Sequence, residues 1–229
     1  MTIRHTVFSN RFFTKRMSAG VLATAIAFGC AALPAQASAA PARSVPAYAV
    51  TGADGLSGYA NAALDAWVAY ARTGSSKNLA SFNLIRDAVA AEAARRLELD
   101  PASMQAAWRK ADSTHQVALL AAFTQLGTKY RRNAREAGVA FDCSGLTSWA
   151  WAQAGRELPR QSGNQIRNVA AVTRDTVQAG DLAYYPGHVM LYLGVGNAVV
   201  HAPFTGRNIE VGFFSKSRTN SIRFGNPVG

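Results

Sequence analysis

The chain has 229 residues, of which 49% are hydrophobic, and its formal net charge is +11 at pH 7. This length allows one sizeable core, or a small helical segment followed by a larger domain. A basic balance suits a polyanionic surrounding, but it does not by itself indicate a fold or an activity. Because the basic residues are scattered and no groove-binding motif is present, we expect no nucleic-acid partner.

Residues 1–39 predict a signal peptide. Four Lys or Arg residues and no acid precede an apolar run at residues 19–33, which is too short for a permanent membrane span, and small A-x-A sites follow the run. Cleavage after residue 37 would lower the formal charge from +11 to +7 by removing these four cations. Phe28 fits poorly upstream of a lipid anchor at Cys30, so we expect a secreted, periplasmic or wall-associated protein.

Residues 40–54 are expected to form a linker, and residues 55–112 a small helical segment. Apolar residues at spacings of three and four predict three helices in this segment, at 56–71, at 82–99 and from Pro101 onward. Asp100 is expected to cap the third helix, with Pro101 in its first turn. The aromatic residues here are expected in the core. The segment's role stays open between a spacer, a wall of a substrate groove and an inhibitory cover.

Residues 113–229 have the pattern of an α+β domain. A helix is predicted at 114–126, and a second one from Cys143 to Ala154, with Asp142 as its cap and Gly155 as its stop. Short β-rich runs separated by Gly, Pro and Asn then predict strands at 182–185, 189–193, 198–201 and 209–214. Helices followed by a meander of strands favour helices packed on an antiparallel sheet.

Cys143 is the main candidate for chemistry. Removal of the signal peptide leaves it as the one cysteine of the mature chain, in a compartment where thiols tend to pair. Its predicted place in the first turn of a helix favours thiolate over thiol. The alternative, that Cys143 is a small buried hydrophobe, stays open on these residues alone.

Two histidines are predicted to meet on one hairpin. His188 opens one strand and His201 closes the next, with a turn at residues 194–197, so the two lie opposite or nearly opposite each other. One imidazole can then fix the tautomer of the other, while the second meets the cysteine. The alternatives are ordinary polar roles for both histidines and a zinc site, for which no fourth ligand is evident. His115 is expected to be an ordinary residue.

Five sequence blocks in order resemble the motifs of the NlpC-like cell-wall cysteine peptidases. They lie within residues 116–225, and each contains the functional residue that the family motif has at that position. The blocks are Asp142-Cys143-Ser144-Gly145-Leu146, Leu158-Pro159-Arg160-Gln161-Ser162 with Gln165, Gly180-Asp181-Leu182, His188-Val189 ahead of Leu191-Tyr192-Leu193-Gly194, and Val200-His201-Ala202-Pro203.

The resemblance implies a papain-like fold in residues 113–229 and hydrolysis of peptidoglycan stem peptides, commonly between D-glutamate and a diamino acid. It implies Cys143 as nucleophile, His188 as base and His201 as the residue that orients the base. It also implies that Tyr130 helps to stabilise the oxyanion, and that Asp142 and Ser144 hold the amino end of the peptide. Where relatives commonly have a Trp-Gly-Gly type stretch, this chain has Arg131-Arg132-Asn133, which either favours an anionic substrate or decorates a solvated loop.

We therefore expect a monomeric enzyme that needs no cofactor and no metal and that acts on peptidoglycan stem peptides. Two alternatives remain at this level. The same residues suit an acyl transferase or amidase with a non-wall substrate, and the chain is also compatible with a catalytically silent wall-binding protein.

Overall fold

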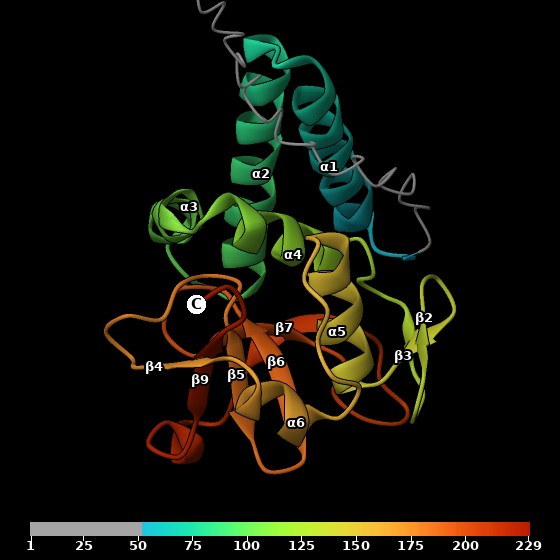
Figure 1. Ribbon diagram of the computed structural model, residues 1–229, viewed down its shortest axis with the longest axis vertical. Coiled ribbons are helices and arrows are strands. Elements are labelled where there is room, and N and C mark those ends of the chain that lie inside the picture. The colour runs from blue at the N-terminus through green and yellow to red at the C-terminus, as the bar shows by residue number, and fades with distance from the viewer. Residues whose placement is uncertain (1–51) are drawn as a thin grey trace, which may run out of the picture. The chain divides into compact units, whose positions relative to one another are not determined.

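The structure is a computed structural model that describes residues 52–229 (Figure 1). The predicted signal peptide, Cys30 and residues 40–51 of the predicted linker lie outside the described residues. The helices are α1 (Gly55–Thr73), α2 (Ser76–Arg96), α3 (Pro101–Lys110), α4 (Ser113–Phe123), α5 (Cys143–Gln153), α6 (Ser162–Arg167) and the 3₁₀ helix η1 (Lys216–Arg218). None of the helices in this part of the chain has the length and apolar character needed to span a membrane.

The strands form two sheets. A small sheet has the order β1-β3-β2, and a six-stranded sheet has the order β4-β9-β5-β6-β7-β8. All the strand pairs of the larger sheet are antiparallel. The strands are β1 (Lys129–Tyr130), β2 (Arg135–Glu136), β3 (Ala140–Phe141), β4 (Ala170–Val172), β5 (Leu182–Tyr185), β6 (His188–Tyr192), β7 (Ala198–His201), β8 (Glu210–Phe213) and β9 (Arg223–Asn226).

Capping residues begin and end the N-terminal helices, and Asp100 is the one that the sequence predicted. Asp54 accepts a hydrogen bond of 2.8 Å from the Leu56 N–H at the start of α1. Gly74 ends this helix with a φ of 66°, in the left-handed region that glycine adopts without steric cost. Asp100 caps α3 by accepting from two N–H groups, and Pro101 occupies the first turn. Local sequence chemistry therefore sets where these helices begin and end.

Helices and sheet share a hydrophobic core. The inward residues of β5, β6 and β7, such as Leu182, Leu191 and Val200, belong to the same buried cluster as Leu64, Phe82 and other residues of α1 to α5. Figure 1 shows α5 beside β6, and the two elements are in contact. The opposite face of the sheet has a smaller cluster that includes Tyr192, Phe214 and Phe224. Helices packed on an antiparallel sheet confirm the predicted α+β class.

Trp108 connects α3 to the sheet. Its ring is 1% exposed, and its indole Nε1–H donates a hydrogen bond of 3.1 Å to the Leu193 carbonyl at the end of β6. The ring also packs edge-on against Phe123 of α4, with centroids 5.2 Å apart. The helices of residues 55–112 thus contribute directly to the packing around the β6–β7 turn.

Candidate active site

Asp142 and Gly145 determine how α5 presents Cys143. The Asp142 carboxylate caps the helix by accepting a hydrogen bond of 2.7 Å from the Gly145 N–H. A Cβ atom at Gly145 would collide with the Ala134 carbonyl oxygen, so this position requires glycine. Cys143 is the first residue of α5, as the sequence predicts.

The Cys143 thiol is 9% exposed and unpaired. Burial raises the pKa of Cys143, and the nearby Asp142 carboxylate adds to this increase. Hydrogen bonds from the Val189 N–H and from Ser144 favour the thiolate, but they do not outweigh burial. Burial therefore outweighs the stabilisation of a thiolate that the helix start was expected to provide. The Cys143 side chain is a neutral thiol at ordinary pH.

His188 and His201 are in direct contact. His188 Nε2 lies 2.9 Å from His201 Nδ1, and the two rings are nearly perpendicular at 73°. The register of β6 and β7 pairs Leu191 with Val200, so the two histidines are diagonal rather than directly opposite neighbours. Because His188 Nε2 is occupied by His201, Nδ1 is the nitrogen left to act on the thiol. The Val189 N–H that bonds to Cys143 belongs to the residue next to His188.

Both imidazoles are neutral at ordinary pH. Burial, followed by the charges of His201 and Arg218, lowers the pKa of His188 to about 3. Burial, followed by the charge of Arg207, lowers the pKa of His201 to about 4. A neutral pair can hold a single donor–acceptor hydrogen bond between the two rings.

Glu210 extends this pair, although no sequence motif pointed to it. It lies opposite His201 in the register of β7 and β8, with its Oε1 3.8 Å from His201 Nε2. This separation is too long for a hydrogen bond, but the carboxylate favours a proton on the facing nitrogen. His201 Nδ1 is then free to accept from His188 Nε2–H, which leaves His188 Nδ1 unprotonated, as a base requires.

Tyr130 lies on β1, whose partner strand β3 leads directly into Cys143. The register pairs Tyr130 with Phe141, and the Tyr130 N–H donates a hydrogen bond of 2.9 Å to the Arg207 carbonyl. Burial raises the pKa of Tyr130, with further increases from the charges of Cys143 and Asp142. The phenol is therefore close enough to the thiol to sense its charge.

Asp142 and Ser144 are brought together with Arg160 of the second motif block. Arg160 donates to both carboxylate oxygens of Asp142, at 2.9 and 2.7 Å, and to the Ser144 hydroxyl at 2.9 Å. Asp142 also accepts from the Asn133 N–H at 2.8 Å. Both Asp142 oxygens thus already have protein partners, so the carboxylate holds the loops around Cys143 in place.

The two consecutive arginines after Tyr130 have different surroundings. Arg131 pairs with Glu136, with an N–O distance of 3.4 Å at the exposed surface. Arg132 has no ion pair among the described residues, and its charge opposes the increase in the pKa of Tyr130. Of the two, Arg132 is the one whose charge acts on Tyr130. In residues 52–229, no three His, Cys, Asp or Glu side chains are grouped as a metal site would require.

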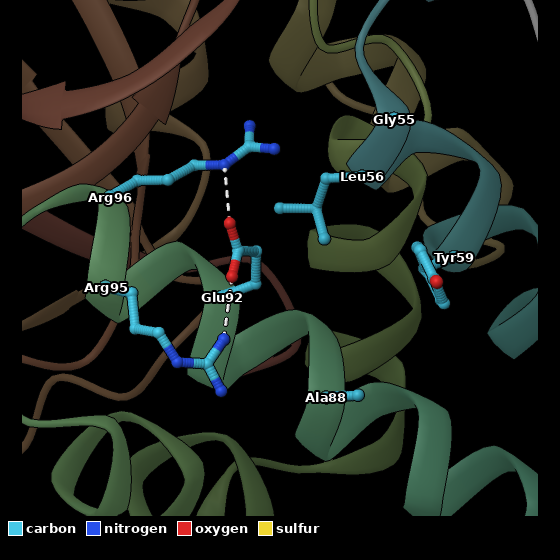
Figure 2. A pocket seen from close by; sticks show the side chains of 7 residues that line it. All are labelled: Gly55, Leu56, Tyr59, Ala88, Glu92, Arg95 and Arg96. Carbon is cyan, nitrogen blue, oxygen red and sulfur yellow. Dashed lines mark hydrogen bonds and ion pairs between the residues drawn. The ribbon is translucent and has the colours of Figure 1, made fainter.

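A separate hollow of about 460 Å³ lies between α1 and α2 (Figure 2). Its charged side chains pair with each other, because Glu92 accepts from Arg95 at 2.7 Å and from Arg96 at 3.3 Å. Arg96 also pairs with Asp54 at 2.7 Å. None of Cys143, His188 and His201 lines this hollow, which is distinct from the candidate active site.

The motif order, the cysteine at a helix start and the histidine pair on the sheet agree with the arrangement that the sequence predicted for a cysteine peptidase site. Residues 127–223 match the NlpC/P60 family, so this part of the chain is an NlpC/P60 domain, which confirms the family that the sequence predicted.

Relatives of known name fit this assignment. A probable endopeptidase of Corynebacterium glutamicum is 41% identical over 116 residues, which are 49% of this chain and 54% of the relative. A gamma-D-glutamyl-L-lysine dipeptidyl-peptidase of Bacillus cereus is 38% identical over 82 residues, 32% of this chain and 24% of the relative. The solved structure of an NlpC/P60 family protein from Bacillus cereus shows 26% identity and a TM-score of 0.46, covering 50% of this chain and 40% of that one. The chain thus spans about half the length, or less, of these relatives.

Proposed function

We propose that this chain is an exported cysteine endopeptidase that hydrolyses peptide bonds in peptidoglycan stem peptides, commonly the bond between D-glutamate and a diamino acid. The main support is the 2.9 Å contact between His188 Nε2 and His201 Nδ1. The next residue along the strand, Val189, donates its N–H to Cys143. The name of the Bacillus cereus relative, a gamma-D-glutamyl-L-lysine dipeptidyl-peptidase, supports a D-glutamyl peptide as the substrate. In this proposal residues 1–39 direct export and residues 113–229 carry the chemistry.

The reaction begins with proton transfer. His188 Nδ1 takes the Cys143 proton as the sulfur attacks the amide carbonyl, because the free thiol is neutral at rest. The Cys143 N–H and the Tyr130 hydroxyl stabilise the negative oxygen that forms. The His188 imidazolium then gives its proton to the leaving amine, the C–N bond breaks and a thioester remains. Water, deprotonated by His188, attacks the thioester and releases the acid and the thiol.

His201 acts as the orienting residue in this sequence of steps. By accepting a hydrogen bond from His188 Nε2–H, it fixes the ring angle and keeps Nδ1 available to both the sulfur and the leaving amine. When His188 becomes an imidazolium, the same contact stabilises the charge, and Glu210 behind His201 adds to this stabilisation.

The test is digestion of purified peptidoglycan and of defined muropeptides, with products identified by mass spectrometry. We expect new carboxyl and amino ends at one bond of the stem peptide, and no products with Cys143→Ala. Equal digestion by Cys143→Ala would overturn the proposal. Binding of the unmodified chain to insoluble wall without cleavage would indicate the silent wall-binding alternative, and transfer of the acyl group to an added amine would indicate a transferase.

A further inference from the structure

Tyr185 connects the candidate base to a cation at the surface. Tyr185 and His188 are directly opposite in the β5–β6 hairpin, and their ring centroids are 5.3 Å apart. The Arg218 guanidinium of η1 lies 4.2 Å from the centre of the Tyr185 ring, within the range of a cation–π contact. The ring thus holds a positive charge beside the base.

Arg218 has no acidic partner among the described residues. Two other arginines around the candidate site do have acidic partners. Arg207 pairs with Glu210 at 2.6 Å, and Arg160 pairs with Asp142 at 2.7 Å. Arg218 is exposed, and no side-chain hydrogen bond or ion pair of its guanidinium is found among the described residues. A guanidinium in this state is a ready binding group for a carboxylate.

The position of the Arg218 charge affects proton transfer to His188. The Arg218 charge is one of the causes that lower the pKa of His188, so it opposes formation of the imidazolium. An anion bound to Arg218 would cancel that opposition at the step in which His188 accepts a proton. A substrate that brings its own negative charge to this point therefore assists the reaction, and a neutral substrate does not.

The side of the scissile bond follows from the chemistry. The residue that protonates the leaving amine must face the leaving part of the substrate, whereas Tyr130 and the start of α5 face the carbonyl oxygen. Arg218 packs on the Tyr185 ring, and this ring packs against His188, so the cation is on the His188 side of the site rather than on the Tyr130 side. A diamino acid that ends the stem peptide carries a free α-carboxylate beside its reacting amine.

We propose that Arg218 binds a carboxylate of the residue on the leaving side of the scissile bond, and so makes the chain selective for acidic leaving residues. This inference rests on the proposed function and names the substrate feature that the same site selects. Arg218 touches the substrate but takes no part in the proton transfers.

The experiment compares two synthetic stem peptides that differ only in a carboxylate or a carboxamide on the leaving residue. For the unmodified chain we expect a kcat/KM about 10-fold higher for the carboxylate peptide, and for Arg218→Gln a ratio near one. Arg218→Lys should retain part of the preference. Arg223→Gln is the matched control, because Arg223 is an exposed arginine 6.0 Å from the Tyr184 ring and has no ion pair among the described residues.

Each outcome separates the two proposals. If the unmodified chain cleaves both peptides at equal rates, or if Arg218→Gln keeps the preference, the inference is wrong while the peptidase proposal stands. If Arg223→Gln also loses the preference for the carboxylate peptide, that preference arises from general surface charge, and the inference is again wrong. Failure of the unmodified chain to cleave either peptide or whole peptidoglycan would instead count against the peptidase proposal.

Discussion

His115 Nε2 lies 3.0 Å from Asp181 Oδ1, and both side chains are completely buried. The contact joins α4 to the residue that precedes β5, the first strand of the hairpin that carries His188. The other Asp181 oxygen accepts a hydrogen bond of 2.8 Å from the Gln178 N–H. The His115 ring packs edge-on against Trp151 of α5, with centroids 4.9 Å apart. His115 is therefore a buried structural residue that connects the nucleophile helix to the base hairpin.

We expect His115→Leu to lower the free energy of unfolding by about 2–4 kcal/mol. The fold would lose stability because the substitution leaves Asp181 buried with one carboxylate oxygen unpaired. Urea denaturation measures the effect, and Asp181→Asn with the double variant completes a cycle. A coupling energy near zero in that cycle would contradict the assigned contact.

His201→Ala is expected to reduce kcat by about 100-fold with little change in KM, because the base loses its orienting partner and not a substrate contact. His201→Gln should recover part of the loss, since its carbonyl oxygen can still accept from His188 Nε2–H. Steady-state kinetics on a defined muropeptide measure both values. A rise in KM at constant kcat would instead assign His201 to substrate binding.

Tyr130→Phe is expected to lower kcat by about 10-fold to 100-fold, because it removes one donor to the oxyanion and keeps the ring. Tyr70→Phe, a change in α1, serves as the control and should leave kcat unchanged. Stability should stay within about 1 kcal/mol of the unmodified chain. An unchanged kcat for Tyr130→Phe would exclude the hydroxyl from the reaction.

Alkylation of Cys143 by iodoacetamide should accelerate with pH and show an apparent pKa above the ordinary thiol value of about 8.5. Burial is the reason, since it disfavours the thiolate, and the two histidines stay neutral above pH 5. The rate is measured by mass spectrometry from pH 5 to pH 10, with Cys143→Ala as the blank. A rate already at its plateau at pH 6 would reveal a preformed thiolate–imidazolium pair.

Acid should destabilise the fold through the same histidines. In the unfolded chain each binds a proton near pH 6.5, but in the folded chain only near pH 3 to 4. The unfolded state therefore holds more protons between these values, and the free energy of unfolding falls as pH decreases from about 6.5, by up to about 1.4 kcal/mol per pH unit for each imidazole. His201→Gln should flatten this dependence, and an equal slope in that variant would contradict the assignment.

The sequence predicted the elements that have strong local signals. Asp100 and Asp142 cap helices as predicted, and the strands that carry His188 and His201 were placed within one or two residues. The histidine contact followed from counting residues across the turn at 194–197. These features depend on neighbours in the chain, which is why one sequence was enough to find them.

Other features depend on contacts distant in sequence. The strands β4 and β9 pair with each other although residues 170–172 and 223–226 are far apart, and neither run is long enough to show a period. Glu210 meets His201 only because β8 pairs with β7, and His115 meets Asp181 only because α4 packs beside β5. The raised pKa of Cys143 depends on burial, which the helix-start pattern does not report.

The proposed nucleophile Cys143, the proposed base His188 and the Arg218 cation come from three separate segments, α5, β6 and η1. The 3₁₀ turn of η1 is exposed and held at its start by the Ser215 hydroxyl, which accepts from the Ser217 N–H at 3.3 Å. Short surface turns tolerate exchange far better than packed strands. A protein engineer could therefore graft other turns at residues 215–219 and retune which peptides are cut, while the chemistry at Cys143 stays as it is.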